Sequence, residues 1–139
     1  MQTISLNRAE TRAISIAAPP EAVLRVIADP RRLPDWAPGF AQTVEPAGDH
    51  WLVSTGDGKA RIRVRVSAEH GTVDLLAAGS PGTGAFMRVL PNRAGSELLF
   101  TLFFPRGTEE PVLTAQMATV QEELETVRRL SLAPGARAA

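Results

Sequence analysis

Few residues of this chain have both the type and the spacing that catalysis needs. Cysteine and tyrosine are absent, which excludes thiolate nucleophiles, disulfides and cysteine-held metals. The two histidines, His50 and His70, both lie beside turns between apparent strands, so a histidine acid/base pair would require those two turns to meet. No carboxylate stands at the spacing of a metal-binding HExxH motif, and we expect neither a metal nor a cofactor.

Three ionisable residues are nevertheless candidates for a catalytic role: Asp35, Arg88 and His70. Asp35 precedes Trp36 in a proline-bounded turn, and a carboxylate beside an apolar opening could act as a general acid or base. The alternative is that Asp35 only makes a cap or turn hydrogen bond.

The role of Arg88 depends on which face of its predicted strand is buried. If Met87 and Val89 point inward, Arg88 faces water and pairs at most with a carboxylate on a neighbouring strand. If Phe86, Arg88 and Leu90 point inward instead, Arg88 is a buried cation that awaits a carboxylate or phenolate of a ligand. The sequence leaves both registers open.

A long helix predicted for residues 109–132 is the element around which these residues must be arranged. Its apolar residues recur at steps of four, three, four and three, which places them on one stripe of an α-helix. They are Leu113, Met117, Val120, Leu124 and Val127. The charged residues expected to face water on the other side are Glu122, Glu123, Glu125, Arg128 and Arg129. An amphipathic helix of this kind needs an apolar surface to cover.

The rest of the chain is predicted to form that surface. Short alternating runs separated by glycine-containing turns indicate an antiparallel meander of six strands. They are residues 41–46, 50–55, 60–68, 72–78, 84–91 and 96–104. A further strand at 10–17 precedes two short proline-bounded helices, one before Asp29 and one within 31–36. We therefore predict an α+β fold in which a curved seven-stranded antiparallel sheet wraps around the C-terminal helix.

Composition narrows the classes of partner. Fifteen basic and fifteen acidic residues cancel, so no overall field favours nucleic acid or an anionic membrane. Arg61, Arg63 and Arg65 form a basic stripe, but interleaved aromatic residues are missing, and we expect a solvated strand face. No run reaches the roughly 20 apolar residues that span a bilayer, and residues 1–10 lack the apolar run of a signal peptide. A cytoplasmic location is therefore expected.

Four segments of the chain follow one another in a characteristic order. They are Ile16-Ala17-Ala18-Pro19-Pro20-Glu21-Ala22-Val23, Ala28-Asp29-Pro30, Leu33-Pro34-Asp35-Trp36 and the C-terminal amphipathic helix. In order and spacing they resemble the START-like superfamily, also called SRPBCC, and within it the bacterial polyketide cyclase/dehydrase type. The resemblance implies a helix-grip fold with one START-like domain over residues 1–133, and the sequence after it, residues 134–139, is expected to be a disordered tail. Members of the superfamily differ in function, so function must be argued from the site.

The resemblance also implies a cavity between the sheet and the final helix. Bulky apolar residues are expected to line this cavity and to contact a ligand. They are Trp36 and Phe40 near the mouth, Trp51, Met87 and Phe103 on strands, and Leu113, Met117, Val120 and Leu124 on the helix. Ordinary core packing is the alternative for each, because stripes of aromatic residues and methionine usually serve packing.

Three functions fit this prediction. The first is a protein that binds a small hydrophobic or aromatic metabolite, lipid- or polyketide-like, in the cavity. The second, implied by the resemblance, is a cyclase/aromatase or dehydratase that folds a reactive chain in the same cavity. The third is a protein with a filled core that acts through its surface, as a homodimer or a partner subunit. An exposed apolar patch around Trp36 and Phe40 would favour the third.

Overall fold

The computed structural model describes residues 3–79 and 83–132, and within these ranges the elements follow the predicted order. They are β1 (Arg8–Ile16), α1 (Pro20–Ile27), the 3-10 turn η1 (Pro30–Arg32), α2 (Leu33–Trp36), β2 (Thr43–Ala47), β3 (His50–Thr55), β4 (Gly58–Ser67), β5 (Thr72–Ala77), β6 (Gly84–Asn92), β7 (Gly95–Phe104) and α3 (Glu110–Ser131). Each predicted strand and the long helix are found within two residues of the expected bounds. The tail predicted for residues 134–139 lies outside the described residues.

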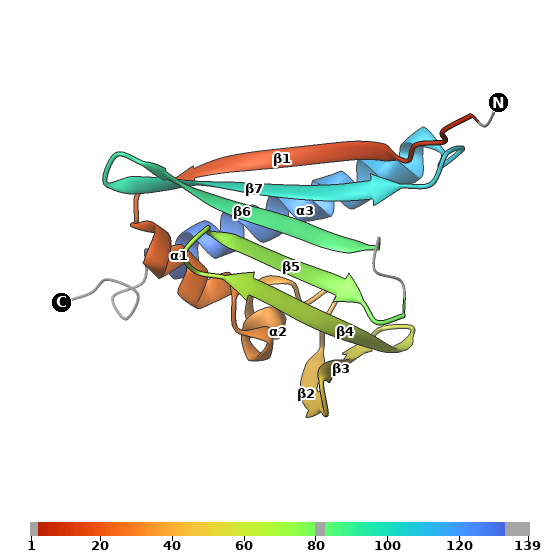
Figure 1. Cartoon of the computed structure of the whole chain (residues 1–139), viewed down its shortest axis with the longest axis horizontal. Helices are drawn as coiled ribbons and strands as arrows, with labels where there is room; N and C mark the ends of the chain where they lie inside the picture. The colour runs from red at the N-terminus through yellow and green to blue at the C-terminus, as the bar shows by residue number, and fades with distance from the viewer. Residues whose placement is uncertain (1–2, 80–82, 133–139) are drawn as a thin grey trace.

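The strands form one antiparallel sheet in the order β1-β7-β6-β5-β4-β3-β2 (Figure 1). Strands β2 to β7 are a meander of sequence neighbours, and β1 adds to its β7 edge. The β4–β5 turn requires Gly71, which has φ +69°, and a Cβ there would lie 2.3 Å from the carbonyl oxygen of Val89. The predicted seven-stranded antiparallel sheet is confirmed.

Helix α3 runs along one face of this curved sheet, which we call the inner face (Figure 1). All five residues of its predicted apolar stripe are buried. Helix α1 packs against α3, β6 and β7, and it buries Ala22, Val23, Val26 and Ile27 there. The result is the helix-grip arrangement that the sequence predicts.

Strand β6 adopts the first of the two registers considered for Arg88. Met87 and Val89 are buried and lie opposite Phe100 and Leu98 of β7, on the inner face. Arg88, between them, is exposed on the other side of the sheet, the outer face. The inward side of the strand, with Met87 and Val89, therefore belongs to the packed core, where α1 contacts β6.

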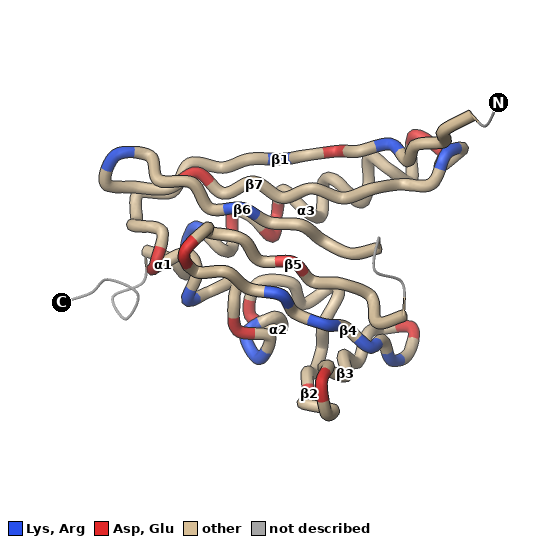
Figure 2. Tube along the Cα trace, viewed as in Figure 1, with Lys and Arg blue, Asp and Glu red and all other residues tan. Residues whose placement is uncertain are grey.

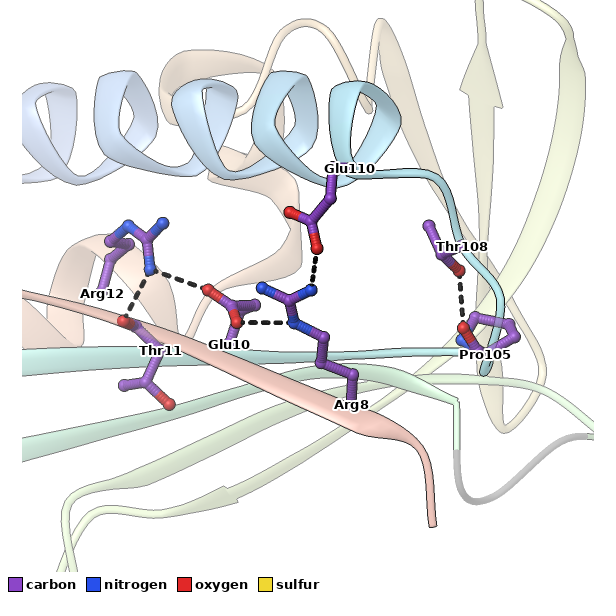
Figure 3. Close-up of polar contacts among 7 residues, drawn as sticks. All are labelled: Arg8, Glu10, Thr11, Arg12, Pro105, Thr108 and Glu110. Carbon is purple, nitrogen blue, oxygen red and sulfur yellow. Dashed lines mark hydrogen bonds and ion pairs between the residues drawn. The ribbon is translucent and has the colours of Figure 1, made fainter. Parts of the chain in front are cut away.

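The start of α3 is tied to the edge strand β1 by ion pairs (Figure 3). Arg8 donates hydrogen bonds to Glu110, in the first turn of α3, and to Glu10 at 3.1 Å, and Arg12 donates to Glu10 at 3.4 Å. The hydrogen bond from Arg8 holds the pKa of Glu10 below its usual value. Arg8 and Glu110 are exposed and Glu10 is partly buried, so the Arg8–Glu110 pair orients the helix start more than it stabilises the fold.

Candidate functional site

A hollow of about 430 Å³ lies between the inner face of the sheet, helix α3 and the segment around α2. Most of its wall is apolar. The lining residues are Leu33, Trp36, Ala37, Phe40, Ala60, Arg61, Ile62, Leu75, Ala77, Thr83, Gly84, Ala85, Phe100, Leu102, Phe103, Phe104, Gln116 and Glu123. A volume of this size falls within the range of small-molecule sites.

The hollow exists because small residues occupy inward positions of neighbouring strands. Ala85 of β6 lies between Leu75 of β5 and Leu102 of β7 in one row across the sheet. In the next row the inward position of β6 is Met87, which is 1% exposed and belongs to the packed core. Ala77, opposite Ile62 of β4, is a second small inward residue, in the neighbouring row on the other side. Along β6, the packed core at Met87 is therefore only two residues away from the hollow at Ala85.

Glu123 places a carboxylic acid in the wall of the hollow. Burial, and to a lesser degree the neighbouring Glu122, raises the pKa of Glu123 to about 7. Within the described part of the chain this carboxyl has no hydrogen bond or ion pair to another side chain. Gln116, seven residues earlier on α3, lines the hollow about 10 Å away along the same helix face. The group can titrate near neutral pH in an apolar setting.

Arg61 is also a charged residue of the described wall, but its guanidinium contacts His50. Its side chain is exposed, and Nη1 lies 2.9 Å from Nε2 of His50. The two neighbours in the basic stripe of β4 (Figure 2) pair with acids: Arg63 with Asp49 at 3.2 Å and Arg65 with Asp74 at 2.7 Å. The stripe is thus largely neutralised by local pairs on the outer face, as expected for a solvated strand.

Trp36 and Phe40 both border the hollow, but they differ in exposure. Trp36 is only 2% exposed, and its indole Nε1 has no hydrogen-bond partner among the described residues. Phe40 is 37% exposed at the rim. The exposed patch around these two residues that would favour a surface function is therefore limited to Phe40.

The remaining expected ligand contacts lie in three settings. Phe103 borders the hollow, but its ring packs edge-on against Phe86 of the outer face, with centroids 5.6 Å apart. The guanidinium carbon of Arg31 lies over the indole ring of Trp51, 5.2 Å from the centroid of that ring. The others are core residues that do not border the hollow: Met87, Leu113, Met117, Val120 and Leu124. For Trp51 and these five, ligand contact stays a prediction.

The three catalytic candidates do not come together. Asp35 is exposed and pairs with Arg32 at 3.6 Å, and His70 contacts Ser67 Oγ at 2.8 Å in the exposed β4–β5 turn. Arg88 lies on the outer face. None of the three borders the hollow, and their catalytic roles stay predictions. Nowhere in residues 3–79 and 83–132 do three His, Asp or Glu side chains group in a way that could hold a metal ion.

Sequence reasoning missed Glu123, because it assigned the residue to the water-facing side of the helix. In the structure Glu123 is half-buried and borders the hollow, so that assignment is wrong. The available signal was its place at the border of the apolar stripe, three residues after Val120 and directly before Leu124. Border positions are buried only where the facing sheet curves far enough around the helix.

The fold and the hollow define a START-like, or SRPBCC, helix-grip protein. Residues 9–131 match the family described as polyketide cyclase / dehydrase and lipid transport. The chain therefore belongs to that family. No curated protein matches the sequence closely enough to count as a relative. None of the helices in the described ranges is both long and apolar enough to cross a membrane.

Several solved structures share the fold. The protein XoxI from Bacillus cereus superposes with a TM-score of 0.72 at 18% identity, covering 90% of this chain and 96% of that one. The Aha1 dimer from Colwellia psychrerythraea gives 0.69 at 16% identity, with 92% and 99% covered. Protein BH1534 from Bacillus halodurans gives 0.70 at 11% identity, with 92% and 99% covered. At these identities the likeness establishes the fold alone.

Proposed function

We propose that this protein binds a small hydrophobic or aromatic metabolite, lipid- or polyketide-like, in the hollow between the sheet and α3. The observation that carries the proposal is the hollow itself, about 430 Å³ with a largely apolar wall. The family description, which includes lipid transport, supports it. Apolar surface that leaves water on binding contributes about 25 cal/mol per Å², so such a wall needs few polar groups to hold a ligand.

A second candidate is a cyclase- or dehydratase-type enzyme that uses the same hollow. It is favoured by Glu123, a carboxyl in the wall with a pKa of about 7, which suits a general acid or base at neutral pH. The two candidates differ in the fate of the ligand. A carrier returns an added ligand unchanged, whereas a dehydratase returns it lighter by one water and a cyclase returns an isomer of it, as mass spectrometry coupled to chromatography of the extracted ligand measures.

A homodimer is a further expectation about this chain. The relative Aha1 from Colwellia psychrerythraea is a dimer, which supports the expectation without fixing it for this protein. Light scattering on the purified protein measures its mass directly. A monomeric mass would remove the expectation and leave the ligand proposal standing.

Titration calorimetry with 1-naphthalenemethanol, a neutral two-ring probe, tests the ligand proposal. We expect saturable binding that is about tenfold weaker in Ala77→Leu, because the larger side chain takes part of the volume that the ring would occupy. The matched control is Ala13→Leu, which places the same change at an exposed position of β1. The proposal fails if the probe does not bind, or if both variants bind it as the wild type does.

A further inference from the structure

The polar side chains in the wall of the hollow narrow the chemical class of ligand that it can bind. This inference rests on the proposed function. Glu123 is the one acidic side chain in the described wall. Burial removes water from the carboxyl of Glu123. No side chain of the described residues replaces that water with a hydrogen bond or a positive charge. A bound molecule is thus in a position to supply the missing partner.

Within the described part of the wall, no side chain places a positive charge against the carboxyl of Glu123. Arg61 borders the hollow, but its guanidinium is exposed and lies 2.9 Å from His50 Nε2. No lysine or histidine belongs to the described wall. Gln116 and Thr83 are neutral and can either donate or accept. An anionic ligand would therefore meet an unpaired carboxylate in an apolar setting, where like charges repel strongly.

We propose that the hollow selects hydrophobic amines, molecules with an apolar body and a protonated nitrogen that pairs with the carboxylate of Glu123. The apolar body packs against the row made by Leu75, Ala85 and Leu102, while the ammonium group donates to Glu123 at the helix wall. Such a charge-assisted hydrogen bond is stronger than a neutral one, and it is strengthened by the surrounding apolar wall.

Three probes of matched shape separate charge from burial: 1-naphthylmethylamine, 1-naphthalenemethanol and 1-naphthoate. Calorimetry at about pH 8, above the pKa of Glu123, measures each affinity for the full chain. We expect the amine to bind about tenfold tighter than the alcohol and the carboxylate to bind weakest. This rank order in the wild type tests the inference without any variant.

Glu123→Gln keeps the shape of the side chain and removes its charge. We expect this variant to bind the amine about as weakly as the alcohol, to bind the alcohol within about twofold of wild type, and to gain affinity for 1-naphthoate. Glu122→Gln is the matched control, because Glu122 is exposed and does not border the hollow. It should keep the wild-type rank order.

Two results have different meanings. If the alcohol or the carboxylate binds as tightly as the amine, or if Glu123→Gln leaves the amine affinity unchanged, selection for amines is overturned while the proposed binding function stands. If none of the three probes binds, the proposed function fails and this inference fails with it.

Discussion

Two leucines of β7 point to the same face of the sheet and lie in different surroundings. Leu98 is completely buried opposite Val89 of β6, whereas Leu102, four residues on, is half-buried opposite Ala85 and borders the hollow. Both are leucines on one strand, so the contrast arises from their neighbours. In this protein the residues across the sheet decide whether a hydrophobic side chain serves packing or lines a site.

The same contrast separates the two ends of the space under the sheet. Around α1, which contacts α3, β6 and β7, buried side chains fill the core. Near α2, small residues such as Ala60 and Ala77 leave the space unfilled. One region provides the stability that allows the other to stay hollow, since an unfilled region lacks contacts that stabilise the fold.

The largest expected effect comes from shortening these two leucines in turn. Leu98→Ala should lower the free energy of unfolding by about 3 kcal/mol, because it creates a cavity in a packed region. Leu102→Ala should lower it by only about 1 kcal/mol, because its side chain already borders open volume. Urea unfolding measures both values. Equal losses would show that the two regions do not differ in packing.

Enlarging a small residue in each of the two regions tests the same difference in packing. Ala22 of α1 is 0% exposed, so Ala22→Leu should destabilise the protein by about 1 to 3 kcal/mol through overpacking. Ala77→Leu adds the same atoms beside the hollow and should change stability by less than about 0.5 kcal/mol. Thermal unfolding of the two variants checks this. A large loss in Ala77→Leu would mean that the space is already filled.

The hollow region should also respond to pH through Glu123. Its folded-state pKa of about 7 exceeds the ordinary value of 4.5, so the folded protein holds the proton more tightly than the unfolded chain. Stability from this group is therefore fully present below about pH 4.5 and is lost as pH rises to about 7. The neighbouring Glu122 adds to this loss, because its negative charge disfavours a second carboxylate beside it.

We expect wild type to lose about 1 to 2 kcal/mol relative to Glu123→Gln between those pH values, after allowance for solvent screening. Urea unfolding of both proteins at a series of pH values gives the difference. Glu122→Gln should follow the wild-type curve closely. Parallel curves for wild type and Glu123→Gln would show that Glu123 is not desolvated.

The smallest effect is expected outside both regions, at the ion pairs of β1 (Figure 3). Arg8→Gln removes the contacts to Glu10 and Glu110, but Arg8 and Glu110 are solvent-exposed and only Glu10 is partly buried. The melting temperature should fall only slightly, and the fall should shrink further in high salt. A loss comparable to that of Leu98→Ala would show that the helix start, and not the core around α1, limits stability.

Much of the fold could be predicted from local patterns. The spacing of Leu113, Met117, Val120, Leu124 and Val127 defined the buried side of α3, since helical periodicity survives any detail of packing. Alternation and glycine turns likewise predicted the strands. The register of β6 stayed open because both faces of that strand carry apolar residues, Phe86 and Leu90 on one and Met87 and Val89 on the other.

The site was harder to predict, because it depends on residues that are distant in sequence. The hollow needs Ala85 and Ala77 to lie in neighbouring inward rows, which only the strand pairing reveals. Bulky residues were therefore expected to line a cavity, yet Met87 and Met117 fill the core. Glu123 was missed for a related reason: its burial depends on how far the sheet curves around the edge of the helix stripe.

The central claim is that the hollow near α2 takes a small apolar ligand, and the two tryptophans test it within one experiment. Trp36 lines the hollow, whereas Trp51 does not border it. In a ¹H–¹⁵N correlation titration with 1-naphthalenemethanol, we expect a saturable shift of the Trp36 indole signal and a much smaller change at Trp51. If the Trp36 signal stays fixed, or if Trp51 shifts instead, the ligand does not bind in the hollow.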